Sequence, residues 1–174
     1  MNNIIVTGFM ASGKTAVSKE LSRLMSKILI DTDDEIVKRL DTSIVDIFDK
    51  FGEEYFRKKE TEILKTVLRS TDAVISTGGG IVLKEENRRL MKESGIVISL
   101  IPDFSVIESR LSSARKTRPL LMEETEKIKK RYYDRLPLYR DCNIEINPSP
   151  DETPAETAKH ILERIDGCAS YLHR

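Results

Sequence analysis

The sequence lacks an excess of either charge. Its 174 residues include 29 Lys plus Arg and 29 Asp plus Glu, so the formal net charge at pH 7 is zero. Proteins whose main task is to bind a phosphate polymer usually carry a basic excess, because counterion release drives that binding. A nucleic-acid-dependent ATPase is therefore disfavoured, and any attraction of this chain to anions has to be local.

Cysteines are few and long apolar runs are absent. Cys142 and Cys168 have neither C-x-x-C spacing nor a nearby histidine pair, which argues against a zinc site and favours reduced thiols. No apolar stretch approaches the roughly 20 residues that a membrane-spanning helix requires. Residues 1–3 lead straight into an apolar run and leave no room for a signal peptide. We expect a soluble, cytoplasmic domain of enzyme size.

Internal repeats and low-complexity linkers are also absent, and 174 residues are most simply one domain, 1–174. Short β-branched runs alternate with amphipathic helical patterns, which indicates a parallel sheet with right-handed crossovers. Strands are expected at residues 4–6, 28–30, 73–75, 96–98 and 144–146, and helices at 14–25, 53–68, 85–92 and 104–111. Thr153, Pro154 and Glu156 form a start signal for a C-terminal helix.

Two segments do not fit this alternation. Residues 112–126 are dense in charge, and residues 147–153 contain two prolines. Connections of this length often act as lids or contact ligands. We therefore expect irregular structure in both.

A phosphate-binding pattern follows the first expected strand. Residues 8–15 read G-F-M-A-S-G-K-T and match the frame G-x-x-x-x-G-K-T, whose backbone amides cradle a nucleoside triphosphate. Lys14 would reach the β- and γ-phosphates, and the Thr15 hydroxyl would bind Mg²⁺. A glycine turn before a surface helix is the alternative, but the strand before and the helix after favour a nucleotide site. The candidate nucleotide-binding residues are Ala11, Ser12, Gly13, Lys14, Thr15 and Ala16.

Acidic side chains follow the second expected strand, in the run Asp31-Thr32-Asp33-Asp34. Ligands of open α/β sheets bind beyond the carboxyl ends of the strands, so these acids share a rim with the phosphate loop. For Asp34 we prefer the role of a helix N-cap. Asp31 and Asp33 alternate in an expected extended segment, where one would face a metal ion and the other an acceptor hydroxyl.

Glycines stand where many phosphate-loop enzymes place an acid. Thr77-Gly78-Gly79-Gly80 closes the third expected strand, and three glycines let a ligand approach the backbone closely. Upstream, Arg57 lies three residues before Glu60 in an amphipathic pattern. Taken alone, this spacing suits an ordinary surface salt bridge.

Taken in order, six motifs resemble shikimate kinase. They are G-F-M-A-S-G-K-T, D-T-D, I-F-x-x-x-G-E-x-x-F-R-x-x-E, T-G-G-G, R-P-L-L and R-x-P-L-Y-R, and the similarity extends from residue 4 to about residue 165. The later motifs are weak singly, but the ordered set is highly specific. The resemblance implies an α/β three-layer P-loop NTPase fold with a five-stranded parallel sheet in the order 2-3-1-4-5, a substrate-binding helical region near 32–60 and a lid near 112–124.

The resemblance also assigns roles to residues. Asp33 corresponds to the residue that orients the acceptor hydroxyl, and Asp31 to the acid that meets Mg²⁺ through water. Arg118, in R-P-L-L, matches a lid arginine that reaches the ATP phosphates, and the second arginine at ATP is either Arg110 or Arg115. Phe48 and Phe56 fall where the family packs rings around the substrate, although plain helix core explains them equally well. The substrate carboxylate and backbone contacts are implied for Arg57, Arg135, Gly78, Gly79 and Gly80.

The implied activity is transfer of the γ-phosphoryl group of ATP to shikimate by a Mg²⁺-dependent monomer, with Lys14, Asp33 and Arg118 as catalytic residues. Such chemistry needs bidentate cations for a carboxylate and preorganised charge around the phosphates. One rival is another small-molecule kinase of this fold, such as a gluconate or nucleoside-monophosphate kinase. A second is a regulatory module that binds nucleotide without turnover. The motifs T-G-G-G and R-P-L-L argue against the first, and the full set of catalytic residues argues against the second.

Overall fold

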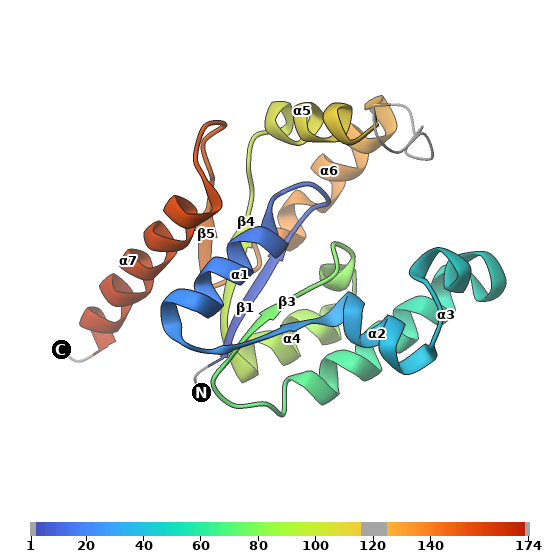
Figure 1. Cartoon of the computed structure of the whole chain (residues 1–174), viewed down its shortest axis with the longest axis horizontal. Helices are drawn as coiled ribbons and strands as arrows, with labels where there is room; N and C mark the ends of the chain where they lie inside the picture. Colours follow the sequence, from blue (N-terminus) through green and yellow to red (C-terminus); the bar gives the residue numbers. More distant parts are fainter. Residues whose placement is uncertain (1–2, 116–124, 173–174) are drawn as a thin grey trace.

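A five-stranded parallel sheet forms the centre of the molecule in a computed structural model that describes residues 3–115 and 125–172 (Figure 1). The order of the strands is β2-β3-β1-β4-β5, and every neighbouring pair is parallel, which confirms the expected topology. The strands are β1 (Asn3–Gly8), β2 (Ile28–Asp31), β3 (Ala73–Ser76), β4 (Gly95–Leu100) and β5 (Ile144–Ile146).

Helices follow each strand and cover both faces of the sheet, because a parallel strand can be rejoined only by a crossover. The described helices are α1 (Lys14–Met25), α2 (Thr32–Leu40), α3 (Ile44–Val67), α4 (Glu85–Ser94), α5 (Phe104–Arg115), α6 (Thr125–Tyr139) and α7 (Pro154–Leu172), with a short 3₁₀ turn, η1 (Ile81–Leu83). None of these helices, within the described ranges, has the length and apolarity needed to cross a bilayer.

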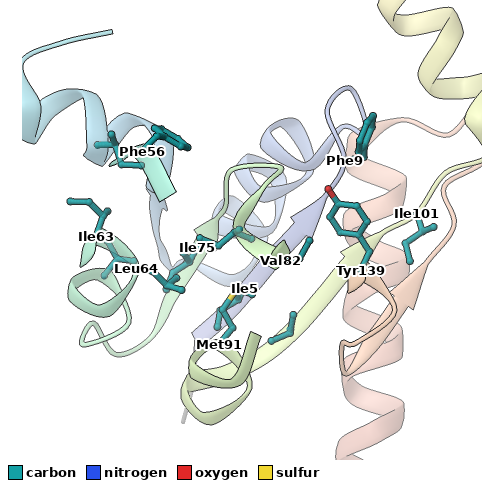
Figure 2. Close-up of a cluster of buried hydrophobic side chains, with 14 of the residues drawn as sticks. Ile5, Phe9, Phe56, Ile63, Leu64, Ile75, Val82, Met91, Ile101 and Tyr139 are labelled. Atoms are coloured by element: carbon teal, nitrogen blue, oxygen red, sulfur yellow. The ribbon is translucent and has the colours of Figure 1, made fainter. Parts of the chain in front are cut away.

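Two apolar clusters lie on opposite faces of the sheet, since successive side chains of a strand point to opposite sides. Ile5 belongs to a cluster with Leu64 of α3 and Met91 of α4, which Figure 2 shows together with Phe9 and Tyr139. The neighbours of Ile5 in β1 instead join the cluster beneath α1 and α7, which is made of Ile4, Val6, Val17, Leu21, Val74, Ala158, Ile161 and their partners. Strand β1 is therefore buried on both faces.

Several expectations about local structure were wrong. Asp33 does not lie in an extended segment, because α2 already begins at Thr32. Helix α3 begins at Ile44, not at residue 53, and is interrupted at Gly52, where φ is 79° and ψ is 172°. The segment 112–126 was expected to be irregular, but α5 continues through Arg115 and α6 begins at Thr125. Its remaining part, 116–124, lies outside the described residues.

Other expectations are confirmed. The C-terminal helix begins at Pro154 with a capping box, in which Glu156 N–H donates to Thr153 Oγ1 at 3.3 Å and Thr153 N–H donates to Glu156 Oε2 at 2.8 Å. The two prolines of residues 147–153 lie in a stretch without helix or strand. The first helix has the expected bounds, Lys14–Met25.

Candidate active site

The loop between β1 and α1 is shaped by two residues in the left-handed backbone region, Ala11 (φ 59°) and Gly13 (φ 95°). Its carbonyl oxygens on one side accept hydrogen bonds from a single arginine: Arg110 Nη1 donates to Ala11 O at 3.1 Å and to Ser12 O at 2.9 Å. Arg110 of α5 therefore fixes the backbone of the phosphate loop. The side chain of Arg115 is outside the described side chains, so the choice between Arg110 and Arg115 at ATP stays open.

Lys14 is the first residue of α1 and lines the same cavity as the acidic and glycine motifs. Burial lowers the pKa of its ammonium group, while the carboxylates of Asp33 and Asp31 oppose that shift. Thr15 and Ala16 follow on the exposed first turn. The N-terminus of α1 thus presents a partly desolvated cation beside free backbone donors, the environment that binds phosphate.

A cavity of about 510 Å³ lies beyond the carboxyl ends of β1, β2 and β3. It brings together seven residues from five separate motifs of the sequence: Lys14, Asp33, Arg57, Gly78, Gly79, Gly80 and Arg135. Phe48 and Phe56 also line it, with ring centroids 4.6 Å apart. Phe56 is buried in the core as well, so it serves the cavity wall and the core together.

Asp33 lies in the first turn of α2 with its Oδ1 atom buried and without a hydrogen-bond partner among the described residues. Burial raises the pKa of this carboxyl group, and Asp31 raises it further, whereas Lys14 and Arg57 oppose the shift. An unsatisfied buried acceptor is costly, and such groups recur at functional sites. Asp33 is therefore suited to accept a hydrogen bond from a ligand hydroxyl.

Asp31 ends β2 and is the N-cap of α2. Its Oδ1 atom accepts from Asp33 N–H at 2.9 Å and from Asp34 N–H at 3.4 Å. The cap that we assigned to Asp34 thus belongs to Asp31, because the helix begins two residues earlier than expected. No group of three or more metal-binding side chains occurs within residues 3–115 and 125–172. A cation here would therefore depend on few protein oxygens, such as those of Thr15 and Asp31, plus water and phosphate.

Arg57 lies between two carboxylates of its own helix, α3. Its Nη1 atom donates to both oxygens of Glu60, at 3.0 and 2.8 Å, and its Nε and Nη2 atoms donate to Glu53 Oε1 at 3.2 Å. Glu60 is only 1% exposed, and burial raises the pKa of its carboxyl group against the opposing effect of Arg57. The pair with Glu60 is therefore a buried contact in the cavity wall, not a surface salt bridge.

The three glycines after β3 differ in their roles. Gly78 N–H donates to Thr32 Oγ1 at 3.0 Å, so this amide already has an acceptor within the protein. The N–H groups of Gly79 and Gly80 have no acceptor among the described residues. The guanidinium of Arg57 lies over Gly80, in the space that a β-carbon would take.

Arg135 reaches the cavity from α6 and is positioned by Tyr139, one helical turn later. The Tyr139 hydroxyl donates to Gly79 O and interacts with Arg135. Burial raises the pKa of Tyr139 to about 12, with Arg135 opposing the shift, so this hydroxyl stays protonated. Tyr139 therefore connects the arginine of α6 to the glycine loop.

Three charged residues of the cavity were not predicted: Glu53, Glu60 and Arg131. The sequence signal for Arg131 is its position four residues before Arg135, which places the two on one helical face. Arg118, predicted to contact ATP, lies outside the described residues, as does most of the predicted lid.

Comparisons with known proteins agree with this site. A family model described as shikimate kinase matches residues 10–166. A shikimate kinase of Caldicellulosiruptor bescii is 40% identical over 164 residues, which cover 93% of this chain and 94% of the relative. The structure of shikimate kinase from Acinetobacter baumannii in complex with shikimate has a TM-score of 0.86 and 32% identity, and covers 96% of this chain and 94% of that one. Shikimate kinase from Aquifex aeolicus has a TM-score of 0.83 and 35% identity over 96% and 98% of the two chains.

Proposed function

The chain belongs to the shikimate kinase family, and we propose how the residues of its cavity perform the reaction that this family catalyses. The enzyme transfers the γ-phosphoryl group of ATP to the 3-hydroxyl of shikimate, giving shikimate 3-phosphate and ADP on the route to chorismate and the aromatic amino acids. One observation carries the assignment of roles: the cavity that holds Lys14 of the phosphate loop also holds Asp33, Arg57 and Arg135.

ATP binds with its phosphates at the loop between β1 and α1. The amides of residues 11–16 cradle the β- and γ-phosphates, and Lys14 neutralises charge between them. Burial lowers the pKa of Lys14, and negative phosphate oxygens beside the ammonium group would favour its charged form. Arg110 supports the loop through the carbonyls of Ala11 and Ser12.

Mg²⁺ would be held by the Thr15 hydroxyl and, through water, by Asp31. The hydroxyl is on an exposed turn and Asp31 stands beside Asp33 at the same rim, so the oxygen donors suit this hard cation. Bound there, the cation would supply positive charge to the phosphates during transfer.

The acceptor hydroxyl donates its hydrogen bond to Asp33. In a loose phosphoryl-transfer transition state, the carboxylate orients the nucleophile and takes its proton late. The unpartnered, buried Oδ1 atom supports this role, because a hydroxyl of shikimate would satisfy it.

The carboxylate of shikimate binds to Arg57 and Arg135, and the amides of Gly79 and Gly80 approach its ring and hydroxyls. Planar guanidinium groups match a carboxylate bidentately. The two arginines come from α3 and α6, both of which contact η1 directly after the glycine loop. Residues 32–60 thus form the substrate-binding region of a single-domain enzyme.

We also propose a lid near residues 112–124, which carries Arg118. The lid closes over ATP and shikimate, excludes water and brings Arg118 to the phosphates. We further propose that the enzyme acts as a cytoplasmic monomer that needs no nucleic acid or membrane.

Separate titrations of the two substrates test the assignment. Arg57→Ala and Arg135→Ala should each weaken shikimate binding strongly and change ATP binding little, because truncating one partner of a desolvated ion pair costs about 2–5 kcal/mol. Lys14→Ala should lower kcat about 100-fold or more with the fold intact. If the two arginine variants lost affinity for ATP but bound shikimate normally, Arg57 and Arg135 would not bind the carboxylate of shikimate. Coupled assays with quinate and gluconate as acceptors serve as specificity controls.

A further inference from the structure

The glycine loop continues through η1 to Lys84, at the start of α4. Ile81 N–H donates to Gly78 O at 3.2 Å. Leu83 N–H donates to Gly80 O at 3.0 Å, so short 3₁₀ hydrogen bonds run along the whole of η1. Lys84 follows directly and is the N-cap residue of α4. The backbone of Lys84 is therefore positioned by the same segment that lines the cavity.

Local helix preferences do not explain a lysine at this position. Its side chain cannot accept the hydrogen bonds that an N-cap side chain usually accepts, and the positive end of the helix dipole disfavours a cation. The side chain of Lys84 makes no capping hydrogen bond, and the first turn of α4 carries Glu85 and Glu86. A contact outside α4 accounts for the lysine better than the helix does.

That contact is with the main chain of α3. Lys84 Nζ donates to the carbonyl oxygen of Arg57 at 3.1 Å. The same oxygen accepts a hydrogen bond from Thr61 Oγ1 at 3.0 Å. Lys84 is half-buried, and a charged hydrogen bond is stronger where water is partly excluded. The turn of α3 that carries Arg57 is thus attached to the end of η1.

The side chain of Arg57 is held at the other end of the same segment. Its guanidinium lies over Gly80, in the space that a β-carbon would take. Its Nη1 atom also donates to both oxygens of Glu60, at 3.0 and 2.8 Å. Because one 3₁₀ turn joins Gly80 to Lys84, residues 80–84 contact both the backbone and the guanidinium of this arginine. Loss of the Lys84 contact would let the two move relative to the glycine amides.

The ammonium group of Lys84 also offsets the charge of Glu60, which is buried. Burial raises the pKa of the Glu60 carboxyl group, and Arg57 opposes that shift; Asp33 adds to it, and Lys84 opposes it. Two cations therefore stabilise this carboxylate together. Arg57 keeps more attraction for a ligand than it would if it balanced Glu60 alone.

We propose that Lys84 is a positioning residue for the acceptor site, which holds the Arg57 turn of α3 against the glycine loop so that the guanidinium meets the substrate carboxylate. Lys84 is not among the described residues that line the cavity, so it acts on the ligand through Arg57. The inference rests on the proposed carboxylate site and extends it to a residue outside the motifs of the sequence.

A double-mutant cycle tests whether Lys84 acts through Arg57. kcat and KM are measured for shikimate and for its uncharged methyl ester with the wild type, Lys84→Met, Arg57→Gln and the double variant. Lys84→Arg is the conservative variant, because it keeps a cationic donor. Lys65→Met is the matched control: Lys65 also joins α3 to α4, through Glu86 at 2.6 Å, but it is 50% exposed and is not part of the described cavity lining.

For Lys84→Met we expect the KM for shikimate to rise about tenfold, since hydrogen bonds to charged groups have that strength. The KM for the ester should rise much less, and kcat and the KM for ATP should stay close to the wild-type values. Lys84→Arg should restore most of the preference for the acid. In the Arg57→Gln background, Lys84→Met should have little further effect on that preference. Lys65→Met should behave like the wild type.

Thermal melting verifies the fold of every variant, and Lys84→Ala takes the place of Lys84→Met in the cycle if the methionine variant is unstable. Equal losses on acid and ester would overturn the role of Lys84. The same holds if Lys84→Met lowers the preference for the acid by an equal factor with and without Arg57. A loss of that preference in Lys65→Met would show that any contact between α3 and α4 has this effect, and would also overturn it.

Arg57→Gln separates these results from a failure of the carboxylate site itself. If Arg57→Gln loses the preference for the acid and Lys84→Met keeps it, only the inference about Lys84 is wrong. If Arg57→Gln keeps the preference, the carboxylate binds elsewhere and both proposals are wrong.

Discussion

Asp33 lies directly against Gly78: a β-carbon at residue 78 would stand 2.5 Å from Asp33 Oδ1. The same point is 3.1 Å from Glu60 Oε1, so carboxylates from α2 and α3 converge on one residue of the glycine loop. Gly78 needs no positive φ for this. Its lack of a side chain is what admits the two carboxylates to the cavity wall.

Substitution of Gly78 should therefore act through Asp33. We expect Gly78→Ala to lower kcat at least tenfold, because the new methyl group displaces the carboxylate that orients the acceptor hydroxyl, and small misplacements of reacting groups are costly. Steady-state kinetics at saturating ATP and shikimate measure the effect.

Gly79→Ala is the control for that substitution within the same loop. A β-carbon at residue 79 would meet its nearest atoms, Gly8 O and Met10 N, at 3.5 Å, an ordinary contact distance. It should retain much more of the wild-type kcat than Gly78→Ala does. If the order of the two variants were reversed, crowding of Asp33 would not be the reason for glycine at residue 78.

The break in α3 at Gly52 gives a prediction about stability. With φ at 79° and ψ at 172°, Gly52 occupies a region that is open essentially to glycine alone. A β-carbon there would meet nothing within 4 Å, so only the backbone is strained. Gly52→Ala should lower the free energy of unfolding by about 1–3 kcal/mol. Denaturant unfolding measures the change.

Gly167 provides the matched control for Gly52. A β-carbon at Gly167 would also meet nothing within 4 Å, but this glycine lies inside helix α7. Gly167→Ala should leave kcat unchanged and raise the free energy of unfolding by up to about 1 kcal/mol, as alanine favours a helix. Similar changes in both variants would mean that the geometry at Gly52 carries no strain cost.

Because the break separates Phe48 from Arg57, Gly52→Ala should also raise the KM for shikimate.

The strands could be predicted from the sequence because runs such as Ile4-Ile5-Val6 are apolar on both faces, as a strand between helix layers requires. The start of α2 could not be read from D-T-D-D, because acids suit both the end of a strand and the first turn of a helix. Only the hydrogen bonds of Asp31 decide between the two. Propensity and pattern locate elements better than they locate the ends of elements.

The sequence identifies residues that line the cavity where a motif fixes both residue type and spacing, as for Lys14 and Arg57. Glu60 was interpreted as a surface partner of Arg57, because its burial depends on α2 and the glycine loop, which lie far away in the sequence. The only sequence signal for Arg131 was its position four residues before Arg135, and an arginine in a charged helix is usually solvated. Its relation to the cavity arises only when α6 packs beside η1.

Arg118 gives a prediction about the closed complex. Arg118→Ala should lower kcat more than it raises the KM for shikimate, because the proposed contact with the ATP phosphates is made mainly in the reacting complex. Arg164→Ala, at an exposed position of α7, controls for the loss of one positive charge. Steady-state kinetics of the two variants, with amide hydrogen exchange across 112–126 with and without ADP plus shikimate, provide the measurement. If kcat were unchanged and the amides exchanged equally with and without ADP plus shikimate, this segment would not act as a lid.

The buried carboxyl group of Asp33 should lower the stability of the protein at neutral pH, although the group is needed for activity. Burial raises the pKa of its carboxyl group above the ordinary value of 3.8, so the folded protein holds this proton more tightly than the unfolded chain does. The stability that this carboxyl contributes is complete below pH 3.8 and is lost as the pH rises through the folded-state pKa. At neutral pH the wild type therefore carries a buried charge that costs stability, and Asp33→Asn removes it.

We accordingly expect Asp33→Asn, free of nucleotide and metal, to melt at a higher temperature than the wild type at pH 7, with kcat nearly abolished. The difference in melting temperature should shrink as the pH falls and vanish well below pH 3.8, where the wild-type carboxyl is protonated in both states. Asp49→Asn, at an exposed position of α3, removes the same charge from the surface and should show no such trend. Melting curves at several pH values measure this. If Asp33→Asn were less stable than the wild type at pH 7, the Asp33 carboxylate would be a stabilising partner of Lys14 and Arg57 instead of an acceptor held ready for the substrate.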